Sequence, residues 1–454
     1  MTSRMDKPSH RQFSVDMDAV FTLFNGQSIS YRQFWRHVYY FSELLPRQDY
    51  LVNDCEDRYL FTVALFSAML NASTTLLPPS KSSGILEELQ RDYGVLCTVT
   101  DQPLPIVRAD QLCIDFASLE QASQCTKPPE SAQFEFDPRQ PVLIAFTSGT
   151  TGRPKAQPKY WNGLIECGQR AIQCLGQDNQ QRVMLSTTPA QHMFGLETSV
   201  LWPYLSALVM TNQRPFYPED IRQTIQSMPY PVVLCSTPTH LRACVNTGGA
   251  WDNLVTVISS TAPLAGTLAN QVESVMGVEL YELFGSTETL SFASRRPTQQ
   301  TAWTPYRGVN LQSVSSQTQL NASYLPQSVS LDDVFELLPG GQFEVTGRAI
   351  DLIKIGGKRA SMTELNHRLQ AISGVIDGCF FKIERSGAEQ RLGIIVVSEL
   401  SPETIITALR RHLDEVFLPR SVYYTQTLPR NRLGKIVDTE LRLMIRQLRK
   451  SSIG

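Results

Sequence analysis

A run of hydroxyl residues and glycines that ends in a lysine carries the clearest chemistry in this chain of 454 residues. The run follows the apolar segment 142–146, which predicts a buried strand. Glycines let backbone N–H groups approach an anion closely, hydroxyls donate to phosphate oxygens, and the lysine adds a positive charge. The G-x-x-x-x-G-K-[ST] pattern is absent, because a proline precedes the lysine and alanine follows it. The sequence therefore predicts a different phosphate-binding loop, formed by Thr147, Ser148, Gly149, Thr150, Thr151, Gly152 and Lys155.

Later segments carry residue types that suit the same chemistry. His192 precedes an apolar run, where an isolated histidine is more often structural than functional. Phe284 has a ring that can stack on a base, and it stands shortly before Thr287 and the carboxylate of Glu288. Lys435 ends a basic, glycine-containing turn that could equally be an exposed surface feature. The order of these residues along one chain favours a shared site.

Taken together, these segments resemble the adenylate-forming superfamily, which includes acyl- and aryl-CoA ligases, luciferases and the adenylation domains of peptide synthetases. The first run reads as the superfamily's T-S-G-T-T-G-x-P-K loop, and the motif style is closest to stand-alone acyl- or aryl-acid AMP ligases. The other motifs follow in the superfamily's order, at 191–196, 259–264, 281–288, 331–337, 347–357 and 428–435.

The resemblance implies a role for each matched residue. His192 would lie beside the carboxylate of the substrate acid. Thr261, which is bulkier than the residue usual there, would lie in a turn against the adenine of ATP. Phe284 would stack on the adenine, Thr287 would contact the α-phosphate, and Glu288 would hold Mg²⁺.

The resemblance also implies roles for residues nearer the C-terminus. Asp333 would bind the ribose, although the superfamily's T-G before it is missing and Asp332 stays open as the alternative. Arg348 would reach the ribose and phosphate, and Gly357 would line a tunnel for the thiol. Lys435 would bridge the substrate carboxylate and the α-phosphate, which makes it the main catalytic residue.

The hinge position departs from the superfamily pattern. The residue two after the arginine is usually Asp or Lys, but here it is Ile350. Asp351 beside it is the alternative pivot, and Lys354 belongs to the same inter-domain motif. We expect a small lid domain to rotate here between the two half-reactions.

Composition limits the classes of partner and compartment. The chain has 41 Lys plus Arg against 43 Asp plus Glu, a net charge of -2, which argues against a nucleic-acid partner. Nine scattered cysteines suit a reducing compartment, and the apolar stretch 60–70 is too short to span a membrane. The sequence predicts a cytoplasmic protein without a membrane partner. Residues 401–454 carry ten basic and five acidic residues, which favours an acidic acyl carrier protein or the phosphates of CoA as partner.

The elements that must position these residues form an α/β pattern. A capping box at Ser30 predicts a helix start, and 59–70 predicts a buried helix. Short apolar runs predict buried strands at 142–146, 232–235, 254–258 and 278–284, and the polar stretch 297–330 suggests loops or short edge strands. We expect a large N-terminal domain, 1–347, with buried sheets flanked by helices. A small mobile α+β lid, 348–454, would follow, with strands at 351–355, 375–381 and 393–397, helices at 362–369 and 404–417, and an amphipathic tail at 437–448.

The resulting hypothesis is a two-step ligase. ATP and Mg²⁺ would activate a small carboxylic acid, aryl or fatty acyl, to an acyl-adenylate, and a pantetheine thiol of CoA or a carrier protein would then displace AMP. One alternative is an amino-acid adenylation enzyme, although 192–195 lacks the aspartate that pairs with an ammonium group there. The other is a catalytically inactive, nucleotide-binding homologue.

Overall fold

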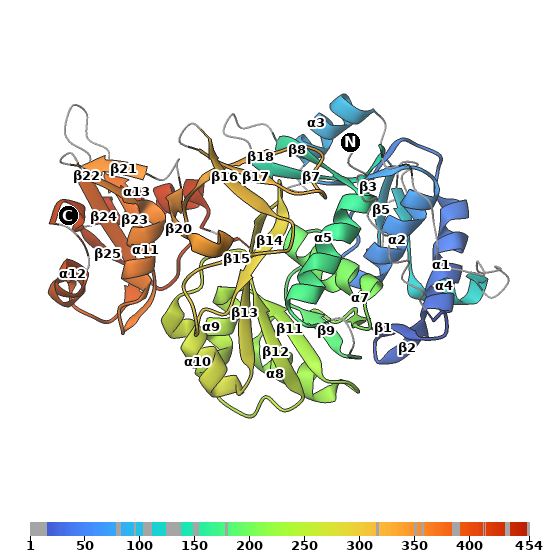
Figure 1. Cartoon of the computed structure of the whole chain (residues 1–454), viewed down its shortest axis with the longest axis horizontal. Helices are drawn as coiled ribbons and strands as arrows, with labels where there is room; N and C mark the ends of the chain where they lie inside the picture. Colours follow the sequence, from blue (N-terminus) through green and yellow to red (C-terminus); the bar gives the residue numbers. More distant parts are fainter. Residues whose placement is uncertain are drawn as a thin grey trace, which may run out of the picture. The chain divides into compact units, whose positions relative to one another are not determined.

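The chain folds into two compact units, shown in a computed structural model (Figure 1). One unit contains residues 1–185 and 189–213, and the other contains 186–188 and 214–454. The division expected at 347 is a different boundary and stays a prediction. The structure describes residues 16–78, 83–94, 97–102, 111–123, 137, 139–148, 154–177, 180–314, 317–348, 352–355, 358–383, 391–411, 413, 415–431 and 436–451.

The first unit is built on buried, mostly parallel strands. One sheet has the order β6-β5-β3-β4-β7-β8, and only the pairing of β7 with β8 is antiparallel. Its strands are β3 (Tyr50–Asn53), β4 (Thr74–Leu77), β5 (Cys97–Thr100), β6 (Gln111–Cys113), β7 (Pro141–Ser148) and β8 (Pro154–Tyr160). Further strands pair in the order β9-β10-β1-β2, with the bounds β1 (Val20–Phe24), β2 (Gln27–Ser30), β9 (Val183–Ser186) and β10 (Val209–Thr211).

Local signals set the helices of this unit. The predicted capping box is confirmed at α1 (Tyr31–Leu44), where the Ser30 hydroxyl accepts from the Gln33 N–H and the Gln33 side chain accepts from the Ser30 N–H. The predicted buried helix is α2 (Arg58–Leu70), and Asp57 caps it. The other helices are α3 (Ser83–Tyr93), α4 (Phe116–Ser123), α5 (Trp161–Cys174), α6 (Met193–Leu196), the π-helix η1 (Glu197–Leu201) and α7 (Trp202–Leu205).

The second unit begins with an α/β portion. Its strands pair in the order β15-β14-β13-β12-β11, and Figure 1 shows α8, α9 and α10 beside β11, β12 and β13. The polar stretch 297–330 forms short strands, as predicted. The elements here are α8 (Pro218–Ser227), β11 (Val232–Ser236), α9 (Pro238–Thr247), β12 (Leu254–Ser259), α10 (Gly266–Met276), β13 (Glu279–Ser286), β14 (Leu290–Arg295), β15 (Thr304–Pro305), β16 (Asn310–Val314), β17 (Gln317–Asn321), β18 (Val329–Leu331), β19 (Asp333–Leu337), the 3-10 turn η2 (Pro339–Gly341) and β20 (Phe343–Arg348).

The C-terminal part of the second unit is a sheet with helices on both faces. Side chains alternate along β23 (Val375–Ile383) and β24 (Arg391–Ser398), so successive residues point to opposite faces. Phe380 and Ile394 pack with α11 (Met362–Gln370) and α12 (Pro402–Arg410), whereas Phe381 and Ile395 pack with α13 (Asp438–Ser451). The remaining elements are β21 (Leu352–Ile355), β22 (Lys358–Ser361), the 3-10 turn η3 (Glu415–Phe417) and β25 (Val422–Tyr424). Residues 352–451 therefore have apolar cores of their own.

One expected helix is shorter than predicted. The segment 404–417 was expected to be continuous, but α12 ends at Arg410 and a separate 3-10 turn begins at Glu415. Ile405, Leu409 and Phe417 are all buried in one core, so their spacing is helical although the helix is not continuous. Periodicity alone does not separate one helix from a helix followed by a turn. Among the described residues, no helix is long and apolar enough to cross a membrane.

Candidate active site

The predicted phosphate loop joins the two strands of a hairpin. Strand β7 leads into it and β8 leaves it, and the ladder pairs Thr147 with Lys155 and Ser148 with Pro154. Paired residues of an antiparallel ladder present their side chains on the same face. The half-buried Thr147 and the exposed Lys155 are therefore neighbours, although eight positions separate them. Gly149, Thr150, Thr151 and Gly152 lie outside the described residues.

His192 is the N-cap of helix α6. Its Nδ1 accepts a hydrogen bond of 3.3 Å from the Phe194 N–H, and its carbonyl accepts one of 2.8 Å from the Leu196 N–H. His192 therefore has a structural role as the cap of this helix. Because Nδ1 accepts this hydrogen bond, a neutral ring carries its proton on Nε2.

The π-helix η1 follows directly, and no sequence motif predicted it. The hydroxyls of Thr198 and Ser199 donate to the carbonyls of Phe194 and Gly195, at 2.7 and 2.5 Å. Such bonds from Ser and Thr to a carbonyl one turn earlier loosen the regular helical ladder. Two adjacent hydroxyl residues in an apolar helix were the sequence signal for this irregularity.

Thr261 has an unusual backbone conformation. Its φ is +79°, in the left-handed region that a β-branched residue rarely adopts. Its Oγ1 is buried and has no hydrogen-bond partner among the described residues. On one side of it, the Ser260 hydroxyl donates to the Leu283 carbonyl at 3.0 Å. On the other side, the Leu264 N–H donates to the Glu282 carboxylate at 3.0 Å. A strained residue held between two anchors is typical of a functional site.

Phe284 lies on β13 within a group of aromatic rings. Its ring centroid is 5.0 Å from that of Trp303 and 5.3 Å from that of Phe292, with edge-to-face geometry. Unlike the buried Phe292 and Phe343, Phe284 is only half-buried. The surrounding rings therefore fix its orientation and leave part of its surface accessible.

Thr287 and Glu288 form the tip of the β13–β14 hairpin. The Ser286 N–H donates to the Thr289 hydroxyl at 3.0 Å, which closes the turn. Gly285 is required just before it, because a Cβ there would lie 2.2 Å from the Leu290 carbonyl oxygen. Both tip residues are half-buried. The hairpin thus brings a ring, a hydroxyl and a carboxylate together within five positions.

Strand register pairs Asp333 with Arg348. They are Cα partners at the end of the antiparallel β19–β20 pair. Asp333 is half-buried and has an interaction partner, whereas Asp332 is exposed before the strand. Asp333 as the ribose ligand stays a prediction, with Asp332 as its alternative.

Several other expected site residues lie outside the described part of the chain. The backbone of Lys354 belongs to β21 and pairs with that of Arg359, but its side chain is not described. The residues whose positions are not described are Ile350, Asp351, Gly357 and Lys435.

The chain on either side of Lys435 is tied down by contacts that no motif predicted. Arg430 binds the Asp377 carboxylate through two hydrogen bonds of 2.7 and 2.8 Å. Arg430 also forms a β-bridge with Ile436, and the Val437 N–H donates to the Pro429 carbonyl. Asp377 precedes Arg430 by 53 positions, so local sequence gave no signal for this pair.

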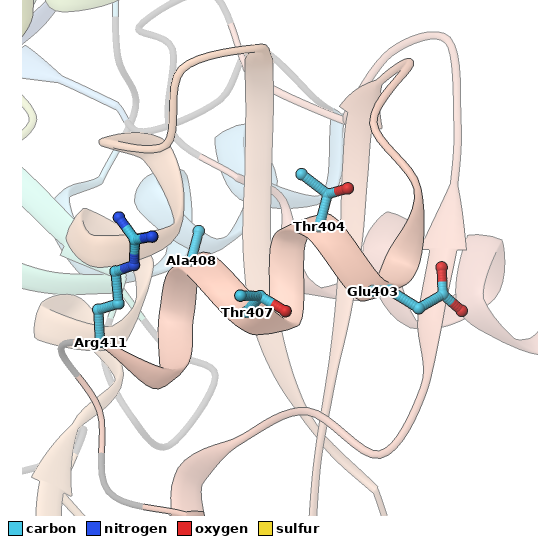
Figure 2. A pocket seen from close by; sticks show the side chains of 5 residues that line it. All are labelled: Glu403, Thr404, Thr407, Ala408 and Arg411. Carbon is cyan, nitrogen blue, oxygen red and sulfur yellow. The ribbon is translucent and has the colours of Figure 1, made fainter.

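A groove of about 400 Å³ lies along α12 (Figure 2). None of the expected site residues contributes to it. The residues that line it are Glu403, Thr404, Thr407, Ala408 and Arg411.

Comparisons with known proteins identify the family of this chain. Residues 9–315 match the model of the AMP-binding enzyme family. A 4-coumarate–CoA ligase of Halorhodospira halophila is 26% identical over 316 residues, which cover 65% of this chain and 74% of that protein. A 3-hydroxybenzoate/4-hydroxybenzoate–CoA ligase of Thauera aromatica is 22% identical over 407 residues, which cover 80% and 75%.

Solved structures show the same fold at lower identity. An anthranilate–CoA ligase in complex with anthranoyl-AMP has a TM-score of 0.76 at 14% identity, covering 96% of this chain and 95% of that one. An o-succinylbenzoate–CoA synthetase of Bacillus subtilis with its acyl-adenylate has a TM-score of 0.76 at 15% identity, covering 94% and 96%.

The chain therefore belongs to the AMP-binding enzyme family, and the expected adenylate-forming α/β fold is confirmed. By class it is an AMP-forming acid–thiol ligase that uses ATP, as the sequence predicted.

Proposed function

We propose that this ligase activates an aromatic carboxylic acid and transfers it to the thiol of CoA. In the first step the carboxylate attacks the α-phosphorus of ATP, and pyrophosphate leaves. In the second step the thiol sulfur attacks the acyl carbon, loses its proton, and AMP leaves. Several relatives named for aromatic acids support this choice, while others named for long-chain fatty acids make a fatty acid the alternative.

The β13–β14 hairpin is the observation that carries the proposal. Phe284, Thr287 and Glu288 lie within this one hairpin. Phe284 would stack on the base, Thr287 would contact the α-phosphate and Glu288 would hold the metal. A carboxylate at the hairpin tip suits the oxygen ligands that Mg²⁺ requires. When bound, Mg²⁺ would neutralise phosphate charge as the two anions approach each other.

Other residues complete the proposed nucleotide and acid contacts. Thr147 and Lys155 would hold phosphate oxygens from the β7–β8 hairpin, together with the loop between them. Asp333 would accept the ribose hydroxyls, with Arg348 opposite it in the ladder. His192 would donate from Nε2 to the substrate carboxylate.

Lys435 is proposed as the residue that brings the carboxylate and the α-phosphate together. Its contribution would be electrostatic, because it neutralises two anions only while they are pressed into contact. We also propose that the lid pivots at Ile350 or Asp351, with Lys354 and Gly357 beside the thiol path. A lysine outside the site during thioester formation is the expected consequence.

Pyrophosphate exchange tests the proposed activity directly. The purified chain would be incubated with ATP, Mg²⁺ and labelled pyrophosphate, together with aromatic, fatty or amino acids in turn. Exchange that depends on an aromatic acid supports the proposal, and exchange with amino acids alone would favour the adenylation-enzyme alternative. Tight ATP binding without exchange for any acid would indicate an inactive homologue.

A carrier protein is a second candidate for the acceptor. One face of α13 is buried through Leu441 and Ile445, and the other exposes Arg442, Arg446 and Leu443, which is 59% exposed. Basic side chains around an exposed leucine would suit an acidic protein surface. Faster acylation of a holo-carrier than of CoA, with a rate that falls at high salt, would favour this acceptor. Salt-insensitive acylation of CoA with no carrier preference would rule against it.

We further propose a cytoplasmic location. The support is the scattered spacing of the nine cysteines, which suits a reducing compartment. Fractionation of cells that express the tagged chain would test it.

A further inference from the structure

Glu282 is a buried carboxylate to which no motif gives a role. It lies on β13 with only 2% of its surface exposed. Strand register places it opposite Ser259 of β12 on one side and Arg295 of β14 on the other. These three polar residues therefore form a row across one face of the sheet, and Phe284 lies two positions along β13 on the same face.

Each oxygen of the Glu282 carboxylate binds a different element. Oε1 accepts from the Leu264 N–H at 3.0 Å, and Oε2 accepts from Arg295 at 2.8 Å (Nε) and 2.7 Å (Nη2). Burial raises the pKa of Glu282, while Arg295 and the Leu264 N–H oppose that rise. A buried charge persists only when such partners compensate for the lost water. The carboxylate thus joins the 260–264 turn to β14.

Arg295 extends the connection to the aromatic group. Its guanidinium lies 4.3 Å from the ring centroid of Trp303 and donates to the Thr301 carbonyl at 2.7 Å. Trp303 in turn packs 5.0 Å from Phe284. One continuous set of contacts therefore runs from the turn that contains Thr261, through Glu282 and Arg295, to the ring of Phe284.

The turn needs this support because its conformation is unfavourable by itself. Thr261 holds a φ of +79° between the Ser260 and Leu264 anchors. Such a conformation persists only where the surroundings impose it. Loss of the hydrogen bond from the Leu264 N–H would let the turn relax. The turn and the Phe284 ring, which are the two groups proposed to contact the base, would then both move.

We propose that Glu282 is a positioning residue that sets the 260–264 turn and the Phe284 ring for the nucleotide base, and so determines the preference for ATP over GTP. This inference rests on the proposed nucleotide contacts of Thr261 and Phe284. It assigns Glu282 no contact with the reacting atoms, so its effect is on base recognition and not on the chemical step.

Nucleotide binding tests the proposal without any acid substrate. Calorimetric titration of the full-length protein with ATP and with GTP would be compared for wild type, Glu282→Gln and Glu279→Gln. Glu279 is the matched control, since it lies on the same strand but is exposed and pairs with Arg296. We expect Glu282→Gln to lower the ratio of ATP to GTP affinity by roughly tenfold, as loss of a charged hydrogen bond implies. Glu279→Gln should leave that ratio within about twofold of wild type, as for surface pairs generally.

A paired variant separates positioning from stability. Glu282→Gln leaves the half-buried guanidinium of Arg295 without its carboxylate partner, so the melting temperature of the variant should fall. Adding Arg295→Met removes that charge and should restore the melting temperature, but not the nucleotide preference. If the preference returns together with the melting temperature, or if ATP and GTP weaken equally, the proposal is wrong. If Glu282→Gln does not fold, the doubly substituted protein still provides the test.

Failure of the Glu282 proposal and failure of the proposed function would give different results. A wild-type protein that prefers ATP but exchanges no pyrophosphate with any acid contradicts the proposed function and leaves the Glu282 test readable. A wild-type protein that does not prefer ATP over GTP overturns the Glu282 proposal itself.

Discussion

The β12–β14 region and the C-terminal sheet β23–β25 bury their side chains in different ways. In the first, a row of Ser259, Glu282 and Arg295 crosses the sheet, and its charges are satisfied by directional hydrogen bonds. In the second, the two faces of the sheet bury apolar side chains such as Phe380 and Phe381 against helices.

This difference between hydrogen-bonded charges and apolar packing shows which of the two regions needs one precise geometry. A buried carboxylate is stable only with its partners in place, so it tolerates one arrangement of the neighbouring turn. Apolar packing is non-directional and supplies stability more than angular precision. The region proposed to recognise the base therefore uses buried polar contacts. Apolar packing is sufficient for the C-terminal part, which is proposed to move Lys435 as one body.

Among the predicted variants, removal of Lys435 should have the largest effect, and this effect should be on activity and not on stability. Lys435→Ala is expected to raise the activation free energy of adenylate formation by about 3 to 4 kcal/mol, as for loss of one preorganised donor. Folding should be unchanged, because the described residues that form the apolar cores of the C-terminal part are held together by their own side chains. Pyrophosphate exchange would measure the first step, and transfer from a supplied acyl-adenylate would measure the second.

Arg410→Ala is the matched control, because Arg410 is an exposed cation on α12. Transfer from the acyl-adenylate should survive in Lys435→Ala. Equal loss of both steps would contradict the assignment of Lys435 to adenylation.

Acid should lower the free energy of unfolding of the first unit, because a histidine is buried there. This unit is a third region, in which a titratable group is buried in its neutral form. His37 is buried, its Nδ1 lies 2.7 Å from the Tyr59 hydroxyl, and its Nε2 lies 3.2 Å from the Glu120 carboxylate. Burial, and then the charge of Arg36, lower the pKa of His37 to about 4. The unfolded chain therefore binds a proton more readily than the folded one. Stability is complete above pH ~6.5 and falls by up to about 3 kcal/mol as the pH drops toward 4.

Urea unfolding between pH 4 and 7 measures this effect. His37→Gln should flatten the slope over that range while lowering stability at pH 7. A pH slope that is the same in the variant would show that other groups cause the acid sensitivity.

Glu288→Gln should give a smaller effect, confined to the metal. The amide keeps the shape of the side chain but removes the negative charge that Mg²⁺ requires. We expect the Mg²⁺ concentration for half-maximal exchange to rise roughly tenfold, or about 1.4 kcal/mol. Unchanged Mg²⁺ dependence would leave Glu288 with only a structural role at the hairpin tip.

Thr261→Gly should have the smallest effect, a rise in stability. It tests whether the backbone of the 260–264 turn is strained. Glycine adopts a positive φ without steric cost, so the melting temperature should rise by the equivalent of about 1 kcal/mol. Thr261→Ala is the control, because it removes the same hydroxyl but keeps a Cβ at the strained position. Equal melting temperatures for the two variants would show that the backbone there is not strained.

Much of the fold was predictable because its signals are local. The capping box at Ser30, the apolar run of α2 and the strand before Thr147 each depend on neighbouring residues, and the structure has all three. The prediction of one helix over 404–417 was wrong because the buried positions Ile405, Leu409 and Phe417 keep a helical spacing although α12 ends at Arg410 and a 3-10 turn begins at Glu415. The π-helix after His192 was missed because it depends on side-chain hydrogen bonds as well as periodicity.

The sequence by itself determined the family, the reaction class and the candidate residues, because motifs such as 147–155 and 281–288 are short stretches whose chemistry is contained in neighbouring residues. Only the tertiary structure decided which distant residues meet. Strand register set Asp333 opposite Arg348 and Glu282 opposite Arg295, and a half-buried ion pair joined Asp377 to Arg430. The physical reason is that tertiary folding, through the ladder of backbone hydrogen bonds for the first two pairs, selects which residues face each other, and spacing along the chain does not.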